Sequence, residues 1–190
     1  MEEFKALVAA AFAPFGLLSA DQLSLLEGHY QLLLRWNRKI NLTRITILRE
    51  VVEYHYCESL YLARSLPPRR LRIADIGSGA GFPGIPVAVY RPDCSVDLVD
   101  SNQRKAVFLT EAVRQLGLGN VRVIPRRAEQ VTESYDWAIS RAVKPDDVLR
   151  LTLSPDVSVL GTVGEKLPWG GGRALFHVKR NRTEPRHCST

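Results

Sequence analysis

The stretch LRIADIGSGAGFPG, residues 71–84, decides the fold. Its first six residues are typical of a short buried strand, and the glycines that follow form a loop leading into a helix from about Gly84. A glycine-rich turn between a strand and a helix lets a ligand approach the backbone near the positive end of the helix. The stretch therefore predicts a nucleotide-like pocket at the carboxyl end of a strand.

The loop fits two cofactor patterns. Gly79-x-Gly81-x-x-Gly84 matches the fingerprint of dinucleotide-binding folds. Asp75-x-Gly77-x-Gly79-x-Gly81 instead fits the first loop of methyltransferases that use S-adenosylmethionine. The glycines alone leave both cofactors open.

Other residues near the loop favour the methyl donor. Asp75 lies inside the strand, where a carboxylate can orient the loop and face the sulfonium or amino-acid end of S-adenosylmethionine. Pro83 and Pro86 stiffen the first helical turn and remove N–H donors that a pyrophosphate would need. Asp100, at the end of the next strand, is expected to accept hydrogen bonds from ribose hydroxyls, but both cofactors contain a ribose.

Strands and helices alternate after residue 67, which predicts a parallel sheet covered on both faces. The predicted strands are 71–76, 95–100, 120–124 and 135–140, with a helix over 102–116. Two later segments, VSVLGTV (157–163) and RALFHV (173–178), flank a glycine-rich stretch and predict an antiparallel hairpin. We assign residues 67–180 to this domain and 181–190 to a polar tail.

Residues 1–66 form a predicted N-terminal helical region. Apolar residues recur at helical spacing over three segments, and Ser19 is positioned to cap the second of them. The third segment runs from about Leu48 to Leu66. Pro67 and Pro68 then end the helical region.

The composition indicates a globular protein with a polyanionic partner. The chain has 190 residues and a net charge of +6. Its three scattered cysteines form neither a disulfide framework nor a zinc site, and no cluster has metal-ligand spacing. There is no basic signal-peptide start and no apolar run of transmembrane length. We therefore expect a soluble cytoplasmic protein, without a membrane partner, acting as a monomer.

Four motifs together resemble the RsmG (GidB) family of bacterial methyltransferases. They are WNRKINLT (36–43), HYxxSL (55–60), DIGSGAGFPGIP (75–86) and SRA (140–142), in the family's order. The resemblance implies a class I S-adenosylmethionine-dependent methyltransferase of α/β, Rossmann-like fold, with a helical region before the sheet. It also implies methyl transfer from S-adenosylmethionine to the N7 of a guanine in 16S rRNA, in free RNA or in the small ribosomal subunit.

The resemblance also suggests residue roles. Gly77 and Phe82 would line the cofactor pocket, Ala128 and Glu129 would flank the adenine, and Arg141 would face the cofactor and the target base. The predicted cofactor site comprises Asp75, Gly77, Gly79, Gly81, Phe82, Asp100, Ala128, Glu129 and Arg141, with Arg141 as the candidate catalytic residue. Guanine N7 carries a lone pair and no proton, so alignment of the reactants can replace a dedicated base.

Basic residues predict the RNA surface. Three clusters of Arg and Lys are candidates for phosphate contacts, and the alternative is a solvated charged face. The candidate RNA-binding residues are Arg38, Lys39, Arg69, Arg70, Lys179 and Arg180. Trp36 is expected to pack in the interior, His55 to be a hydrogen-bonded structural histidine, and Asn41 to cap or to face the active site.

The chain departs from the family pattern at two places. Glu58 stands where the family has aspartate, and its longer side chain is expected to change a contact between the helical region and the sheet. The stretch after Ala142 is short and has no counterpart of a family lysine, so the fifth-strand region is predicted to be shortened. This leaves open an RNA-binding protein that has lost activity, or a methyltransferase with another substrate. An oxidoreductase is the weakest interpretation.

Overall fold

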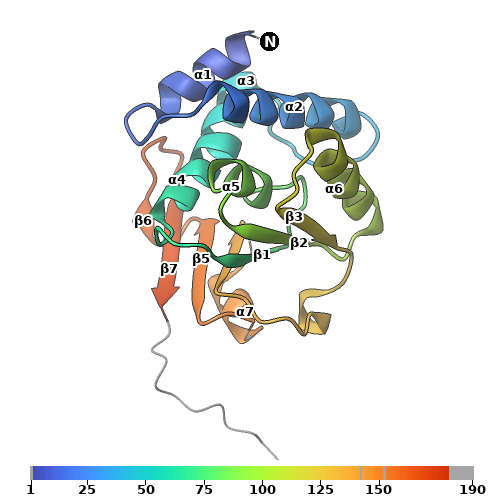
Figure 1. The fold of residues 1–190 in the computed structure, drawn as a ribbon. Helices are drawn as coiled ribbons and strands as arrows, with labels where there is room; N and C mark the ends of the chain where they lie inside the picture. Colours follow the sequence, from blue (N-terminus) through green and yellow to red (C-terminus); the bar gives the residue numbers. More distant parts are fainter. Residues whose placement is uncertain (1, 142, 152, 180–190) are drawn as a thin grey trace, which may run out of the picture.

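The computed structural model describes residues 2–141, 143–151 and 153–179 (Figure 1). Within them lies a seven-stranded sheet of order β3-β2-β1-β4-β5-β7-β6. The strands are β1 (Arg72–Ile76), β2 (Ser95–Val99), β3 (Val121–Ile124), β4 (Trp137–Arg141), β5 (Asp156–Gly161), β6 (Glu165–Lys166) and β7 (Ala174–Lys179). The first five are parallel, and β7 runs antiparallel to β5 and β6. The predicted parallel sheet is confirmed.

The N-terminal residues form helices, as predicted. They are α1 (Glu2–Phe12), α2 (Ala20–Asn37) and a continuous helical segment of α3 (Leu48–Val51), the π-helical turn η1 (Val52–Cys57) and α4 (Glu58–Ser65). The Ser19 side chain accepts a hydrogen bond from the backbone N–H of Gln22, and the Gln22 side chain accepts one from the backbone of Ser19. This capping box confirms Ser19 as the start signal of α2.

The two faces of the sheet are covered unequally. Figure 1 shows α4, α5 (Gly84–Tyr90) and α6 (Gln103–Leu116) on one face and the short α7 (Pro145–Arg150) on the other. The core on the first face extends from Phe4 of α1 to Trp137 of β4, so the N-terminal helices and the sheet share it. The core under α7 is smaller and includes Val148 of that helix.

The elements on either side of the fifth strand are short. The VSVLG segment forms β5, whose six residues include no lysine. Before β5 the chain has only the six-residue α7, and after β5 only the two-residue β6. The predicted antiparallel pairing of the two apolar segments is confirmed, with Val157 opposite Val178. The glycine-rich turn, however, joins β6 to β7, and Gly170, Gly171 and Gly172 there have positive φ.

Two further points concern the chain as a whole. None of the helices among the described residues combines the length and the apolar character needed to cross a bilayer. The predicted polar tail, residues 181–190, lies outside the described residues.

Candidate functional site

The predicted cofactor residues lie along the carboxyl edge of the parallel strands. The glycine loop follows β1, Asp100 follows β2, and Arg141 is the last residue of β4. Because β1 pairs in parallel with both β2 and β4, these three strand ends meet at the same edge. Ala128 and Glu129 form the short 3-10 turn η2 (Ala128–Gln130) after β3, the strand beyond β2. Ligands of open α/β sheets bind at this edge.

The conformation of the loop distinguishes the roles of its glycines. Gly77, Gly79 and Gly81 have φ of 71°, 57° and 85°, a region that favours glycine. Gly84 begins α5 without a positive φ, yet a Cβ there would clash with Leu98 and lie 2.5 Å from the Asp75 Oδ2. The register that starts at Asp75 therefore contains the three turn-forming glycines, and Gly84 serves close packing of α5 on the sheet.

Asp75 is a buried carboxylate with one oxygen in use. Its Oδ2 accepts a hydrogen bond from the backbone N–H of Gly84 at 3.0 Å, which holds the end of the loop as predicted. Its Oδ1 is buried and has no hydrogen-bond partner among the described residues. Burial raises the pKa of Asp75 from 3.8 to about 7. A buried carboxylate oxygen without a donor is an acceptor available to a cationic or N–H-bearing group of a ligand.

Asp100 braces the loop from the neighbouring strand. Its Oδ2 accepts from the backbone N–H of Gly79 at 2.8 Å, and its Oδ1 accepts from that of Asn102 at 2.9 Å. Asn102 in turn caps α6 by accepting from the N–H groups of Arg104 and Lys105. Each carboxylate oxygen has a second lone pair, so Asp100 can still accept from a ligand hydroxyl.

The ring of Phe82 packs against the helical region. The residue is 1% exposed, and its ring is stacked on His55 at a centroid distance of 4.7 Å and edge-on to Tyr56 at 5.1 Å. The ring therefore fills the contact between the helical region and the sheet. That Phe82 also lines the cofactor pocket stays a prediction.

His29 fastens α2 to the glycine loop, a role that the sequence reasoning missed. Its Nε2 lies 3.0 Å from the Ala80 carbonyl and its Nδ1 lies 3.0 Å from the Tyr56 hydroxyl. The carbonyl can only accept, so Nε2 carries the proton and Nδ1 accepts from Tyr56. Burial lowers the pKa of His29 to about 4, which keeps the ring neutral. Its spacing from Leu26 and Leu33 on the buried face of α2 is the signal that could have identified it.

Arg141 is held by the helical region. Its Nη1 donates to the Tyr54 carbonyl at 3.3 Å and to the His55 Nδ1, and the guanidinium carbon lies 4.9 Å from the centre of the Phe82 ring. No carboxylate of the described residues lies within ion-pair distance of it. Burial, and next the charge of Arg173, lower its pKa to about 10, so it stays cationic at neutral pH.

The WNRKINLT segment reaches the same place through hydrogen bonds. The Asn37 Oδ1 accepts from the backbone N–H groups of Leu42 and Thr43 at 2.8 and 3.0 Å. The Thr43 Oγ1 then lies 2.8 Å from the His55 Nε2. His55 is thus a hydrogen-bonded histidine, as expected. Asn41 is exposed, so the organising residue of the loop is Asn37, which the sequence reasoning overlooked.

Two further expectations about this region are resolved. Trp36 is partly buried, with its ring 5.8 Å from that of Phe108, which confirms its packing role. Glu58 is fully buried and forms a two-pronged ion pair with Arg173, in which Nη2 and Oε2 are 2.7 Å apart. This pair joins α4 to the residue that precedes β7. Burial raises the pKa of Glu58, and Arg173 opposes that shift.

The predicted RNA-binding residues divide between two edges of the sheet. Arg38 and Lys39 are exposed and lie in the segment that Asn37 and Thr43 connect to His55. Arg69 and Arg70 precede β1, at the opposite, amino edge. Lys179 lies opposite Asp156, the first residue of β5, and therefore also at the amino edge. Arg180 lies outside the described residues.

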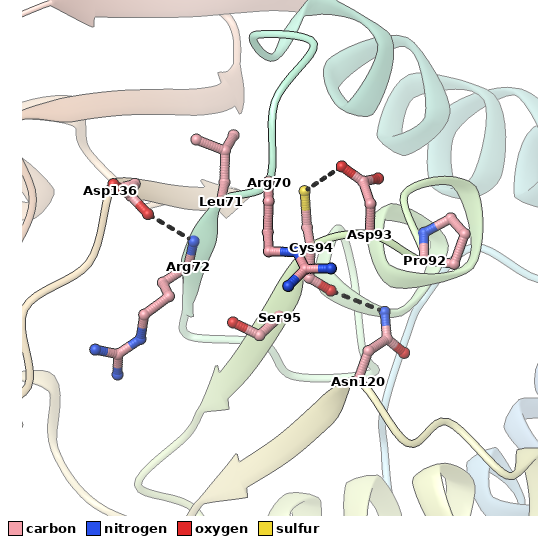
Figure 2. Close-up of a pocket in the computed structure, with 9 residues that line it drawn as sticks. All are labelled: Arg70, Leu71, Arg72, Pro92, Asp93, Cys94, Ser95, Asn120 and Asp136. Carbon is pink, nitrogen blue, oxygen red and sulfur yellow. Dashed lines mark hydrogen bonds between the residues drawn. The ribbon is translucent and has the colours of Figure 1, made fainter.

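A pocket of about 500 Å³ lies at the amino edge (Figure 2). Arg70, Arg72 and Ser95 line it, together with Asp93 and Asp136. The Asp136 Oδ2 accepts from the backbone N–H of Arg72 at 2.8 Å. Because the glycine loop and Asp100 follow the opposite ends of β1 and β2, this pocket is separate from the candidate cofactor site.

Comparisons with known proteins agree with this geometry. The family model GidB, described as rRNA small subunit methyltransferase G, matches residues 22–163. A protein of Halorhodospira halophila named ribosomal RNA small subunit methyltransferase G is 42% identical over 156 residues, which cover 79% of this chain and 73% of that protein. A protein of the same name from Desulforamulus reducens is 42% identical over 139 residues, covering 70% of this chain but only 58% of its own length.

The fold is shared with a solved methyltransferase. Coclaurine N-methyltransferase, bound to N-methylheliamine and SAH, superposes with a TM-score of 0.51 at 15% identity, covering 84% of this chain and 58% of that one. At this identity the likeness concerns the Rossmann-like fold alone. The family match, by contrast, spans most of the chain and includes the glycine loop, Asp100 and Arg141. The chain belongs to the GidB family, rRNA small subunit methyltransferase G.

Proposed function

We propose that this protein transfers the methyl group of S-adenosylmethionine to the N7 of a guanine in 16S rRNA. The observation that carries the proposal is the arrangement at the carboxyl edge, where the glycine loop, Asp75, Asp100 and Arg141 follow adjacent parallel strands. Family membership adds the class of substrate, a small-subunit ribosomal RNA.

The residues present fit S-adenosylmethionine. The unpartnered buried Asp75 Oδ1 suits a cationic amino-acid end, and the free lone pairs of Asp100 suit ribose hydroxyls. The positive-φ glycines allow close approach to the loop backbone. Ala128 and Glu129 border the same edge on the side of β3, where an adenine would extend. A pyrophosphate suits this edge less well, because the buried Asp75 would repel it.

The chemistry asks little of the protein beyond alignment. S-adenosylmethionine supplies a methyl group on a positively charged sulfur, and guanine N7 attacks with an in-plane lone pair. No proton has to leave N7, so no general base is required. The task of the chain is to orient the two reactants and to hold the base out of its stack. Arg141, a cation at the strand edge, is positioned to orient the guanine or an adjacent anionic group.

We assign RNA contacts to both edges of the sheet, at different distances from the target base. Arg38 and Lys39 belong to the segment hydrogen-bonded toward Arg141, so they would contact RNA close to the target base. Arg69, Arg70 and Lys179 would contact RNA farther from it, as phosphate partners. The expected partner is 16S rRNA or the small subunit that contains it, met by a monomer in the bacterial cytoplasm.

Transfer of labelled methyl from S-adenosylmethionine to small-subunit RNA lacking the modification tests the proposal. Mapping the product should locate the label at N7 of one guanine. Parallel reactions with free RNA and with assembled subunits identify the accepted form of the substrate. Binding of S-adenosylmethionine without transfer to either form would contradict the proposal and favour an RNA-binding protein that has lost activity.

A further inference from the structure

The partner that holds Arg141 carries no charge. Arginines that are buried are usually paired with carboxylates. Among the described residues, the only side chain that accepts a hydrogen bond from Arg141 is His55, and the other acceptor is the Tyr54 carbonyl. Both acceptors bind Nη1. The partly buried cation is therefore anchored on one side without a carboxylate in direct contact.

The proton on His55 can be assigned from its neighbours. A guanidinium only donates, so the His55 Nδ1 must accept and Nε2 must carry the hydrogen. Nε2 then donates to the Thr43 Oγ1 at 2.8 Å. Burial, followed by the charges of Arg141 and Arg173, lowers the pKa of His55 to about 2. The ring is thus a neutral acceptor toward Arg141 throughout the physiological pH range.

A neutral acceptor has an effect that a carboxylate lacks. It fixes the direction of the guanidinium through Nη1 and the Phe82 ring without forming an ion pair. The carboxylates of Glu58 and Asp75 act on the Arg141 charge through space, without direct contact. None of the hydrogen bonds given for the described residues uses Arg141 Nε or Nη2. Those N–H groups form the fork that binds planar anionic oxygens in a two-pronged manner.

We propose that His55 is a positioning residue that orients Arg141 while keeping its charge available for an anionic group of the ligand. The inference rests on the proposed function for the identity of that ligand. The shared chemistry is an anionic oxygen, which either the carboxylate of S-adenosylmethionine or a phosphate of the RNA can supply. Thr43 and Asn37 extend the positioning into the WNRKINLT loop, because they fix the ring of His55.

Three substitutions of His55 separate positioning from packing. His55→Asn keeps a neutral oxygen acceptor near the place of Nδ1, His55→Leu removes the acceptor, and His55→Asp supplies a carboxylate that neutralises Arg141. Binding is measured calorimetrically for S-adenosylhomocysteine, which keeps the amino-acid carboxylate, for methylthioadenosine, which lacks it, and for a small-subunit RNA fragment. Thermal unfolding of each variant verifies folding.

The expected result is selective for the anionic ligand. His55→Leu should weaken binding of S-adenosylhomocysteine or of the RNA by about tenfold, His55→Asp by more, and His55→Asn by less. Methylthioadenosine should bind all variants equally. Weakening confined to S-adenosylhomocysteine identifies the carboxylate as the partner of Arg141, and weakening confined to the RNA identifies a phosphate.

A double-mutant cycle supplies the decisive control. If His55 acts through Arg141, adding His55→Leu to Arg141→Gln should weaken binding no further. Thr43→Val should resemble a mild form of His55→Leu, and Thr43→Ser should bind like the unaltered protein because it keeps Oγ. Additive losses, or equal weakening of methylthioadenosine, would overturn the proposal. These readouts are binding constants, so failure of the unaltered protein to methylate RNA would count against the proposed function alone.

Discussion

The two edges of the sheet treat their charges differently. At the carboxyl edge, Asp75 is buried and Arg141 is partly buried, and neither has an oppositely charged partner in contact. At the amino edge, Arg91 and Asp93 form an ion pair at 2.9 Å, and Arg69 lies 3.6 Å from Asp136. Charges that are paired within the protein need no ligand to balance them. Burying an unpaired charge lowers the stability of the fold. Such charges are found at functional sites, where a bound ligand supplies the missing partner.

The largest effect is expected from the unpaired carboxylate of Asp75, whose burial should lower the free energy of unfolding. Its folded-state pKa is raised from 3.8 to about 7, so the folded protein binds more protons than the unfolded chain between these values. The free energy of unfolding should therefore fall as pH rises from about 4 to about 7, and stay low above that. The shift corresponds to about 4 kcal/mol, using about 1.4 kcal/mol per pKa unit.

The measurement compares the unaltered protein with Asp75→Asn by urea unfolding across this pH range. The other titratable groups are present in both proteins, so their contributions to the pH dependence of stability cancel in the difference. The charges nearest Asp75 are Arg141, which lowers its pKa, and Asp100, which raises it. The stability advantage of Asp75→Asn should grow between pH 4 and pH 7 and then level off. A constant difference would show that folding does not raise the pKa of Asp75.

The next effect concerns the backbone of the carboxyl edge. Gly84→Ala should lower the free energy of unfolding by roughly 2–3 kcal/mol, because the added Cβ meets Leu98 and the Asp75 Oδ2. Gly119→Ala is the matched control, since a Cβ there has no heavy atom within 4 Å. Denaturant midpoints of the two variants should differ clearly. Equal midpoints would mean that α5 can move away from β1 without cost.

A smaller effect is expected from the charge of Arg141. Arg141→Gln should reduce kcat/KM for methyl transfer by about 10- to 100-fold, because a hydrogen bond from a charged donor is lost. Arg91→Gln, at the amino edge, removes an arginine that is paired with Asp93 and should change kcat/KM by less than about twofold. Comparable losses in both variants would erase the distinction between the edges.

The smallest effect belongs to the pocket at the amino edge. Arg70→Gln combined with Arg72→Gln should leave the Kd for S-adenosylmethionine unchanged and weaken RNA binding slightly. The dependence of log K on log salt should become shallower by about 0.7–0.9 for each phosphate contact removed. Fluorescence titrations at several salt concentrations measure this slope. An unchanged slope would remove these arginines from the RNA surface.

Sequence patterns predicted the features that depend on chain neighbours. The capping box at Ser19, the strand periodicity and the glycine loop are each encoded within a few residues, so their signals are local. The contacts that build the site are not local. His29 and Ala80 are 51 positions apart, and His55 and Arg141 are 86 apart. Such pairings depend on how α2 and the π-helical turn pack on the sheet, which no local pattern specifies.

The burial of Phe82 illustrates the same limit. Its place in the glycine loop is visible in the sequence, but the packing of its ring in the aromatic core between the N-terminal helices and the sheet is not. Burying an aromatic ring among apolar partners is strongly favourable, so packing determined the outcome. Likewise, nothing in the sequence around Glu58 indicated that its partner is Arg173.

The ion pair between Glu58 and Arg173 also constrains the order in which the protein can be completed during synthesis. The two residues are separated by 115 positions. At roughly 5–20 residues per second, Arg173 leaves the ribosome about 6–23 s after Glu58. During that interval, burying the Glu58 carboxylate would leave it without its partner, at a cost of several kcal/mol. The helical region therefore emerges first but reaches its final packing only when the β6–β7 hairpin arrives.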